Sequence, residues 1–360
     1  MSNSRIRAKH VFSAQSLAAL ILLLLGPAAV AQQPPAPTGF YDGAPYLGQV
    51  RDRYVYGDIW ARPGLSARDR SMITVAVTQA LYATNELRLH MGRALDNGVT
   101  QAEISEIIAH TLWYSGFPTG VNAARVAAEV FKARGLPDTP PGASSRQPPV
   151  NPELEFPGAF PQTPYLRDLL NEVVYAETWT REELSPRDRS MITVAVGTAL
   201  GASSEVRYHS GRALDNGVTQ AELAEVLYHV AFYAGFSVAT NGANVLAEVY
   251  KARNLPMGEG RYPAAPYLEE LVDGLIDGET WTRTQLSARE RSIAIIAATL
   301  ANYQSGELRV QLGRGLDNGL TTQEIAELIA QVTMYSGFPT GVNASMTFVE
   351  VLQERGMALP

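Results

Sequence analysis

The chain has 360 residues, a formal net charge of −7 and no cysteine. The length allows two or three domains, and a hydrophobic share of 46% with 18% charged residues is typical of a folded globular protein. Without cysteine the chain cannot form disulfides, use a thiol nucleophile or bind a metal through thiolates. An acidic chain binds nucleic acid and anionic membranes poorly, so we expect neither as a partner.

The first 31 residues have the pattern of a secretory signal peptide. A basic start precedes an apolar run (16–27), and Ala29-Val30-Ala31 is a small-residue cleavage site. We expect cleavage after Ala31 and a periplasmic or secreted mature protein without membrane attachment. An uncleaved membrane anchor is the alternative, but the run is shorter than the roughly 20 residues that cross a bilayer.

One pattern then occurs three times. The tryptophans show the spacing, since Trp60 recurs as Trp179 and Trp281 with the same neighbours and no insertion inside a repeat. The expected domains are a signal peptide (1–31), a Pro-rich lead-in (32–43), repeat one (44–136), a Pro-rich linker (137–163), repeat two (164–256), a short linker (257–264) and repeat three (265–360).

Each repeat is predicted to be helical. In repeat one, residues 46–60 form an amphipathic segment, and Ser66 with Asp69 resembles a capping box that opens a second segment at 70–82. That segment is partly β-branched, so a strand is an alternative. Its length, its cap and its alanines favour a buried helix.

Three further helices follow in the same repeat. The first of them (86–97) ends at Gly98, which is a typical residue just past a helix end. Thr100 and Glu103 form a capping box for the second, and Phe117-Pro118 opens the third, which Gly135 ends. The predicted fold class is all-α.

A Glu-x-x-x-His pair lies on the helix at 86–97. Glu86 and His90 are four residues apart and share one helix face; repeat two has Glu205 and His209. A carboxylate beside an imidazole fixes the tautomer and raises the pKa, which suits acid/base catalysis near neutral pH. A surface ion pair without a catalytic role is the alternative.

A second histidine recurs on the next helix, as His110 and His229. Repeat three has glutamine at both histidine positions, Gln311 and Gln331. Glutamine keeps the hydrogen bonding but cannot titrate near pH 7, so we predict acid/base sites in repeats one and two only. Buried histidines that bond a backbone carbonyl are the alternative for this second position. Glu, His and His would also suit a divalent metal, but no wider ligand pattern supports one and no metal is predicted.

Arginines and tyrosines recur near these positions. Arg70 and Arg189 open the second predicted helix and are candidates for substrate binding, since Arg binds carboxylates bidentately; a structural ion pair is the alternative. Tyr114 and Tyr233 precede a Gly-Phe turn and predict an aromatic wall, either of a ligand site or of the core.

The motifs together resemble those of a known family. Glu-x-Arg-x-His, followed by Ala-Leu-x-Asn-Gly-Val-Thr and Tyr-x-Gly-Phe-Pro, is similar to the carboxymuconolactone decarboxylase family of the alkylhydroperoxidase D-like fold. The resemblance covers all three repeats and implies helical domains that assemble as trimers or multiples of trimers, with sites near the subunit contacts. Three tandem copies are therefore expected to close into an intramolecular pseudo-trimer.

The resemblance also implies a reaction. Family decarboxylases remove a carboxylate from a small lactone without a cofactor, in the degradation of aromatic rings. Glu86 and His90, with Glu205 and His209, would be the acid/base groups. A small carboxylate or lactone is the expected partner, with self-association as a further option.

Some features separate this chain from the family pattern. The peroxidase branch of the superfamily uses Cys-x-x-Cys-x-x-x-His, and Glu86 stands in place of the second cysteine, so a thiol peroxidase mechanism is excluded. The classical pathway is cytoplasmic and its subunits are identical, so a different lactone or acid is an equal expectation. A non-catalytic binding or assembly scaffold and a metal-dependent variant are the alternatives.

Overall fold

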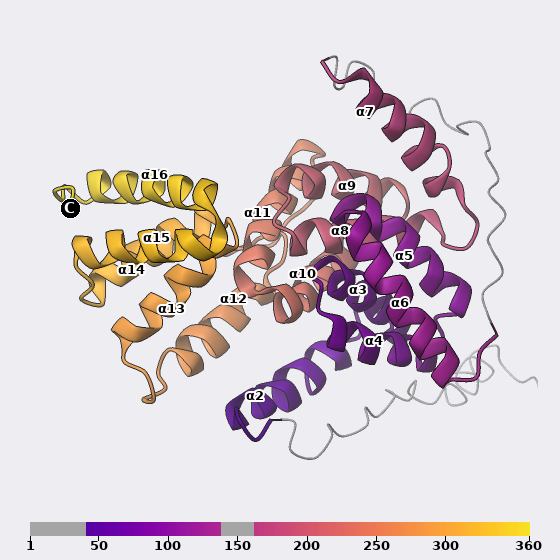
Figure 1. Ribbon diagram of the computed structural model, residues 1–360, viewed down its shortest axis with the longest axis horizontal. Coiled ribbons are helices and arrows are strands. Elements are labelled where there is room, and N and C mark those ends of the chain that lie inside the picture. The colour runs from indigo at the N-terminus through magenta and orange to yellow at the C-terminus, as the bar shows by residue number, and fades with distance from the viewer. Residues whose placement is uncertain (1–40, 138–161) are drawn as a thin grey trace, which may run out of the picture. The chain divides into compact units, whose positions relative to one another are not determined.

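The computed structural model describes residues 41–137 and 162–360 (Figure 1), and these contain helices and no strand. The prediction of an all-α fold is confirmed. The predicted signal peptide and most of the first linker lie outside the described residues. Among the described residues, no helix has the length and apolar character needed to cross a membrane.

The described residues up to Ala61 belong to one compact unit. α2 (Pro45–Val50) continues into a π-helical segment, η1 (Arg51–Tyr56), and a 3-10 turn, η2 (Ile59–Ala61), follows. Proline suits the first helical position because its missing N–H has no partner there anyway. The sequence predicted one continuous helical segment and did not indicate its wide π-helical part.

The second unit begins at Arg62 and contains four equivalent helices in each repeat. They are α3 (Ala67–Ala80), α4 (Thr84–Asp96), α5 (Gln101–Ser115) and α6 (Phe117–Ala133) in repeat one, α8 (Pro186–Ala199), α9 (Ser203–Asp215), α10 (Gln220–Ala234) and α11 (Phe236–Ala252) in repeat two, and α13 (Ala288–Ala301), α14 (Ser305–Asp317), α15 (Thr322–Ser336) and α16 (Phe338–Glu354) in repeat three. The segments before them are α7 (Pro164–Leu169), η4 (Leu170–Tyr175) and η5 (Thr178–Thr180) in repeat two, and α12 (Tyr267–Leu271) and η6 (Val272–Thr280) in repeat three.

Local sequence determines where these helices begin and end. Ser66 Oγ accepts a hydrogen bond of 3.0 Å from the Asp69 amide, and Thr100 with Glu103 forms a complete capping box. Residues 70–80 are therefore helical, and the strand alternative is wrong. Gly116 separates α5 from α6 at a φ of +93°, a conformation that glycine adopts easily because it has no Cβ.

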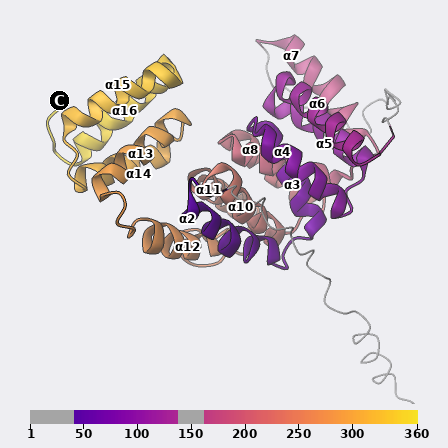
Figure 2. The same cartoon turned by 60° about the horizontal axis from the view of Figure 1, so that its bottom comes forward.

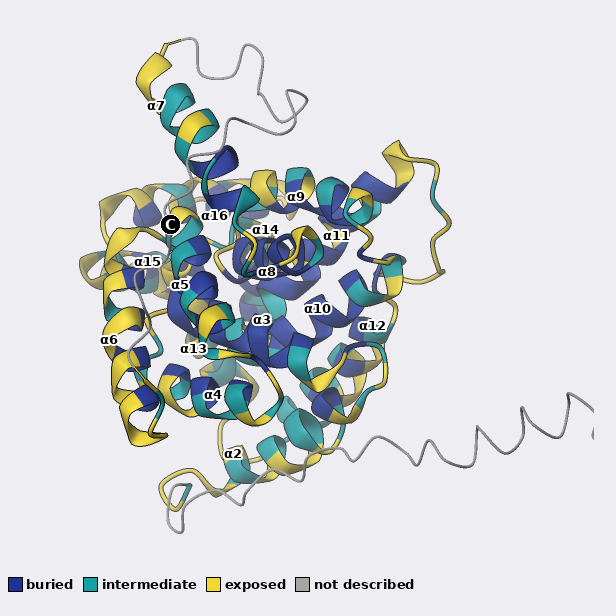
Figure 3. Ribbon diagram, turned by 90° about the vertical axis from the view of Figure 1, so that its right-hand side faces the viewer, coloured by how far each residue is buried: buried dark blue, intermediate teal, exposed yellow. Residues whose placement is uncertain are grey.

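Repeats one and two pack together through their innermost helices. α3 packs against α8, and each of them also packs against the α5 or α10 helix of the other repeat. Figure 3 shows α3, α8 and α10 buried along most of their length. Every residue of α3 from Asp69 onward is buried, because this helix lies between its own repeat and the second one.

Repeat three differs in its packing. α13 to α16 pack with one another (Figures 1 and 2), and in the described chain the main helix packing between repeats joins the first to the second. Repeats one and two form a two-fold pair, in which α3 and α8 play equivalent parts. The pseudo-trimer expected from the sequence stays a prediction.

Candidate active site

His209 and Glu205 share one face of α9, as their spacing predicted. His209 Nε2 lies 3.4 Å from Glu205 Oε2, and the equivalent atoms of His90 and Glu86 on α4 are 3.7 Å apart. The His209 ring is buried, whereas 52% of the Glu205 side chain is exposed. Each pair therefore extends from the protein interior to solvent.

Aromatic rings enclose His209. Trp179 stacks on it with ring centroids 5.7 Å apart and planes at 8°, and Tyr114 of repeat one approaches edge-on at 5.3 Å. Trp179 Nε1 donates a hydrogen bond of 2.9 Å to the Tyr114 hydroxyl, which fixes both rings. A tyrosine from repeat one therefore completes a site whose Glu-His pair belongs to repeat two.

His110 belongs to the same site as His209. Its ring lies 5.0 Å from Trp179 and 5.4 Å from Tyr114. In the second site Tyr233 of repeat two lies 5.3 Å from His90 and 4.9 Å from His229. The sites thus lie between repeats, and each combines the Glu-His pair of one repeat with the His and Tyr of the other.

A buried hydroxyl holds the second histidine of each site. His110 Nε2 lies 2.8 Å from Thr193 Oγ1, and Thr193 donates its own hydrogen to the Arg189 carbonyl at 2.8 Å. Because the hydroxyl hydrogen is already used, His110 Nε2 is the donor. His229 and Thr74 repeat this geometry at 2.7 Å. A threonine hydroxyl thus holds each of these histidines, and the Arg189 backbone also interacts with His110, as the backbone-carbonyl alternative expects.

Burial determines the charge of these imidazoles. Desolvation, with a smaller effect of Arg93, lowers the pKa of His90 to about 3. Desolvation also lowers the pKa of His209 although Glu205 opposes it, and it holds the pKa values of His110 and His229 well below the ordinary range. The prediction of a raised pKa is wrong, because loss of solvent outweighs an exposed carboxylate. All four rings are neutral near pH 7.

Arg70 and Arg189 lie in the contact between the repeats. Arg189 Nη1 is 2.8 Å from Glu106 of repeat one, and Arg70 Nη2 is 3.0 Å from Glu225 of repeat two. Both guanidinium groups are fully buried. The prediction that they bind substrate is therefore corrected, since their charges are already paired and they join the two repeats.

A different arginine, Arg212, faces the His209 site. Its guanidinium lies over the Trp179 ring at 4.5 Å and the Tyr175 ring at 4.9 Å. Its Nη1 is buried without a hydrogen-bond partner among the described residues. The predicted site residues do not include Arg212, although the sequence holds a signal for it. An arginine recurs two residues before each Leu-Asp-Asn-Gly, as Arg93, Arg212 and Arg314.

Repeat three shows what neutralises this arginine. Arg314 lies over Trp281 at 4.1 Å and donates to Asp277 Oδ1 at 2.6 Å. Asp277 occupies the position of Tyr175 in repeat two. Repeat three therefore supplies its own carboxylate to the arginine, and repeat two offers an aromatic ring instead.

The histidine positions of repeat three also lack titratable groups. Gln311 Nε2 donates a hydrogen bond of 2.6 Å to Glu307, and Gln331 is exposed. This copy therefore joins the two helix positions by an amide–carboxylate hydrogen bond and has no imidazole.

A surface groove lies next to Arg212. It has a volume of about 570 Å³, lies between α9 and α11, and is lined in part by Tyr208 and Arg212. The Tyr208 ring meets the His209 ring edge-on at 5.0 Å. The Arg212 side chain is therefore shared by this groove and the aromatic rings around His209.

Metal ligands are sparse around these side chains. Within residues 41–137 and 162–360, no three His, Asp or Glu side chains gather in a way that would hold a metal ion. Besides His110 or His229, the neighbours of each Glu-His pair are aromatic rings and an arginine, Arg93 or Arg212. In this part of the chain, the metal-dependent alternative therefore has no ligand set.

The carboxymuconolactone decarboxylase family model matches the chain at residues 45–129, 164–248 and 266–350. The chain belongs to the carboxymuconolactone decarboxylase family. The three matches cover the Glu-His pairs of repeats one and two and the Glu-Gln pair of repeat three.

Three relatives of this carboxymuconolactone decarboxylase family member each match about a fifth of the chain. A 4-carboxymuconolactone decarboxylase of Acinetobacter baylyi is 43% identical over 84 residues (23% of this chain, 63% of the relative). A nitrosuccinic acid decarboxylase of Metarhizium robertsii is 39% identical over 78 residues (22% and 54%), and an uncharacterised 15.0 kDa protein of Paracoccus denitrificans is 33% identical over 78 residues (21% and 58%). The chain thus spans less than two thirds of the length of each relative.

Proposed function

We propose that the chain is an exported, cofactor-free carboxy-lyase that releases CO2 from a small carboxylated lactone or a related acid. Relatives named decarboxylases support this activity, and the predicted signal peptide supports export. The observation that carries the proposal is the neutral, buried His209 ring inside an aromatic enclosure, with the Arg212 charge beside it. The two active sites would be those between repeats one and two.

The enclosure suits the loss of a carboxylate. In the reaction the bond between the carboxyl carbon and its neighbour breaks, neutral CO2 leaves, and the electron pair moves onto the neighbouring carbon and its conjugated carbonyl. The Trp179 and Tyr114 rings would desolvate the carboxylate, which favours a change that removes its charge.

His209 is placed to deliver the proton that replaces CO2. Its ring is neutral in the free protein, and a bound anion would raise its pKa because a nearby negative charge favours the imidazolium form. The imidazolium would then protonate the carbon and return to the neutral form. Glu205, half exposed and 3.4 Å away, would pass the next proton from solvent. Overall, one carboxylate and one proton become one C–H bond and CO2.

Arg212 would anchor a second acid group. An arginine binds carboxylates with strong, directed hydrogen bonds, and Arg212 Nη1 has an unused donor. A substrate with two acid groups would place one on Arg212 and the other against the rings near His209. This arrangement predicts a preference for dicarboxylic substrates.

The test is CO2 release from small carboxylated lactones and dicarboxylic acids, 4-carboxymuconolactone and nitrosuccinic acid among them. The wild-type protein should release CO2 from at least one, and His90→Gln with His209→Gln should lower kcat by roughly 10²- to 10⁴-fold with unchanged circular dichroism. Gln311→His, the reverse exchange in repeat three, is the matched control and should change nothing. Binding without CO2 release would identify a scaffold, and full activity in the double variant would refute the site.

A further inference from the structure

α13 presents a face that is covered in the other two repeats. Ala294 and Ala298 are exposed on it, whereas their counterparts in α3, Ile73 and Val77, are buried. The buried counterparts lie on the helix that packs against α8. Repeats one and two thus show what covers this face in the fold, namely another copy of the same repeat.

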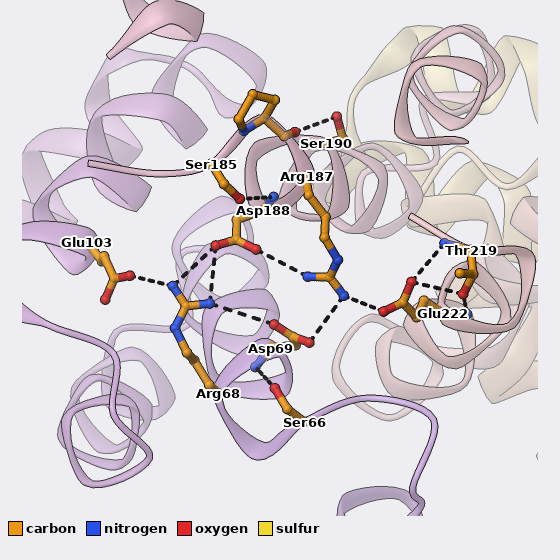
Figure 4. A network of polar contacts seen from close by, with 11 residues as sticks. Ser66, Arg68, Asp69, Glu103, Ser185, Arg187, Asp188, Ser190, Thr219 and Glu222 are labelled. Atoms are coloured by element: carbon orange, nitrogen blue, oxygen red, sulfur yellow. Dashed lines mark hydrogen bonds and ion pairs between the residues drawn. The ribbon is translucent and has the colours of Figure 1, made fainter. Parts of the chain in front are cut away.

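Ion pairs between charged side chains cross the contact between repeats one and two. At the helix starts, Arg68 Nη1 lies 3.1 Å from Asp188, and Arg187 Nη2 lies 3.4 Å from Asp69. Figure 4 shows these two crossed pairs side by side. Deeper in the contact, the buried Arg70–Glu225 and Arg189–Glu106 pairs cross in the same two-fold manner. Each repeat therefore gives an arginine and an acid to both sets of pairs.

Repeat three retains both members of every such pair. Arg289 and Glu290 stand at the helix start, and Arg291 and Glu327 stand at the deeper positions. Arg289 is held by Glu324, just as Arg68 is held by Glu103. The copy that lost its imidazoles has kept the residues of the contact.

The deeper pair of repeat three is incomplete among the described residues. Arg291 Nη2 donates 2.6 Å to the Arg283 carbonyl, the same backbone bond that Arg189 makes to Arg181. No carboxylate of the described residues pairs with Arg291, and its Nε is buried without an acceptor there. Glu327 is exposed, whereas its counterparts Glu106 and Glu225 are buried.

In repeats one and two a tyrosine reaches into the site of the other repeat, and its counterpart in repeat three is exposed. Tyr114 is half-buried against His209 and Trp179 of the other repeat. Its counterpart Tyr335 is 84% exposed. Aromatic side chains with this exposure are common at protein interfaces.

We propose that this face binds the same face of repeat three in a second copy of the chain. A two-fold contact requires that both partners present the same complementary residues, and repeat three presents Arg289 with Glu290 and Arg291 with Glu327. The contact between repeats one and two is already complete, so repeat three of another chain is the matching surface. The protein is then a dimer in which repeat three serves assembly and repeats one and two serve chemistry.

The test is the molar mass of the mature chain in solution, measured by light scattering after gel filtration. The wild type should be a dimer. Glu327→Arg sets a second arginine against Arg291 in both halves of the two-fold contact and should weaken the dimer by at least roughly 100-fold. Glu259→Arg, the same exchange in an exposed carboxylate of the segment between repeats, should leave the dimer intact.

A mixing experiment separates a broken contact from a misfolded chain. Arg291→Glu should also be monomeric, but an equal mixture with Glu327→Arg should form a heterodimer, because every position 291 then meets an opposite charge at position 327. Arg289→Glu mixed with Glu290→Arg tests the exposed pair in the same way and does not alter a buried residue. A monomeric or trimeric wild type, a dimer that survives Glu327→Arg, or mixtures that stay monomeric would overturn the proposal.

Discussion

His209 and Glu205 are separated by one helical turn but lie in different surroundings. The ring is enclosed by Trp179 and Tyr114, and the carboxylate is half exposed. The energy of a charge depends on how much water it keeps, so the enclosed ring stays neutral beside an ionised neighbour. The sequence shows the four-residue spacing but not the enclosure, because the enclosing rings come from other elements. The direction of the pKa shift was therefore beyond sequence analysis.

The buried histidines predict how stability depends on pH. His90 has a folded-state pKa of about 3 and an unfolded value of about 6.5, so below pH 6.5 the unfolded chain gains a proton that the folded one does not. The free energy of unfolding should fall between pH 6.5 and 3 by about 1.4 kcal/mol per pH unit for His90. His90→Gln should reduce this slope by about one proton in urea denaturation between pH 4 and 6. Equal slopes in both proteins would contradict the assignment of a neutral ring.

Replacing Arg212 should weaken substrate binding. In the His90→Gln background, where only the His209 site works, Arg212→Gln should lower kcat/KM by roughly 10- to 100-fold, the loss of a charged hydrogen bond. Arg314→Gln in repeat three is the matched control and should have no effect, because Asp277 already neutralises Arg314. Steady-state CO2 release gives the result, and equal effects of the two changes would argue against an anion site at Arg212.

At the scale of elements, predictions succeeded where the signal is local. Ser66, Thr100 and Gly116 mark helix ends through their own backbone and side-chain bonds, so caps and boundaries were readable from sequence. The pairing of His110 with His209 was not readable. Each repeat carries the same residue types, and no local pattern states which copy a side chain faces.

Removing a buried ion pair between repeats one and two should strongly lower the free energy of unfolding. Glu106→Gln should lower the free energy of unfolding by roughly 3–5 kcal/mol, because it leaves Arg181 and buried Arg189 without their shared carboxylate. Glu129→Gln removes the exposed partner of Arg88 and should have little effect on stability, because solvent screens this pair. Denaturation curves of the two variants compare the effects directly, and similar small losses would mean that Glu106 does not hold the repeats together.

At the scale of the molecule, the two proposals assign different roles to copies of one repeated fold. Repeats one and two keep the Glu-His pairs and face each other, so each can complete the other's site. Repeat three keeps the contact residues Arg291 and Glu327 but carries Gln311 and Gln331 in place of histidines. The threefold repeat was evident from sequence, while the two-fold contact was not, because the number of copies does not fix the symmetry of their contact.

The central claim is that each site is shared between repeats one and two, and two double variants test it most directly. His110→Gln with His209→Gln alters one site only, so about half of the wild-type CO2 release should remain. His90→Gln with His110→Gln alters one histidine in each site, so activity should fall as far as in His90→Gln with His209→Gln. If the first double variant were inactive and the second kept half of the activity, the sites would lie within repeats and the account would be contradicted.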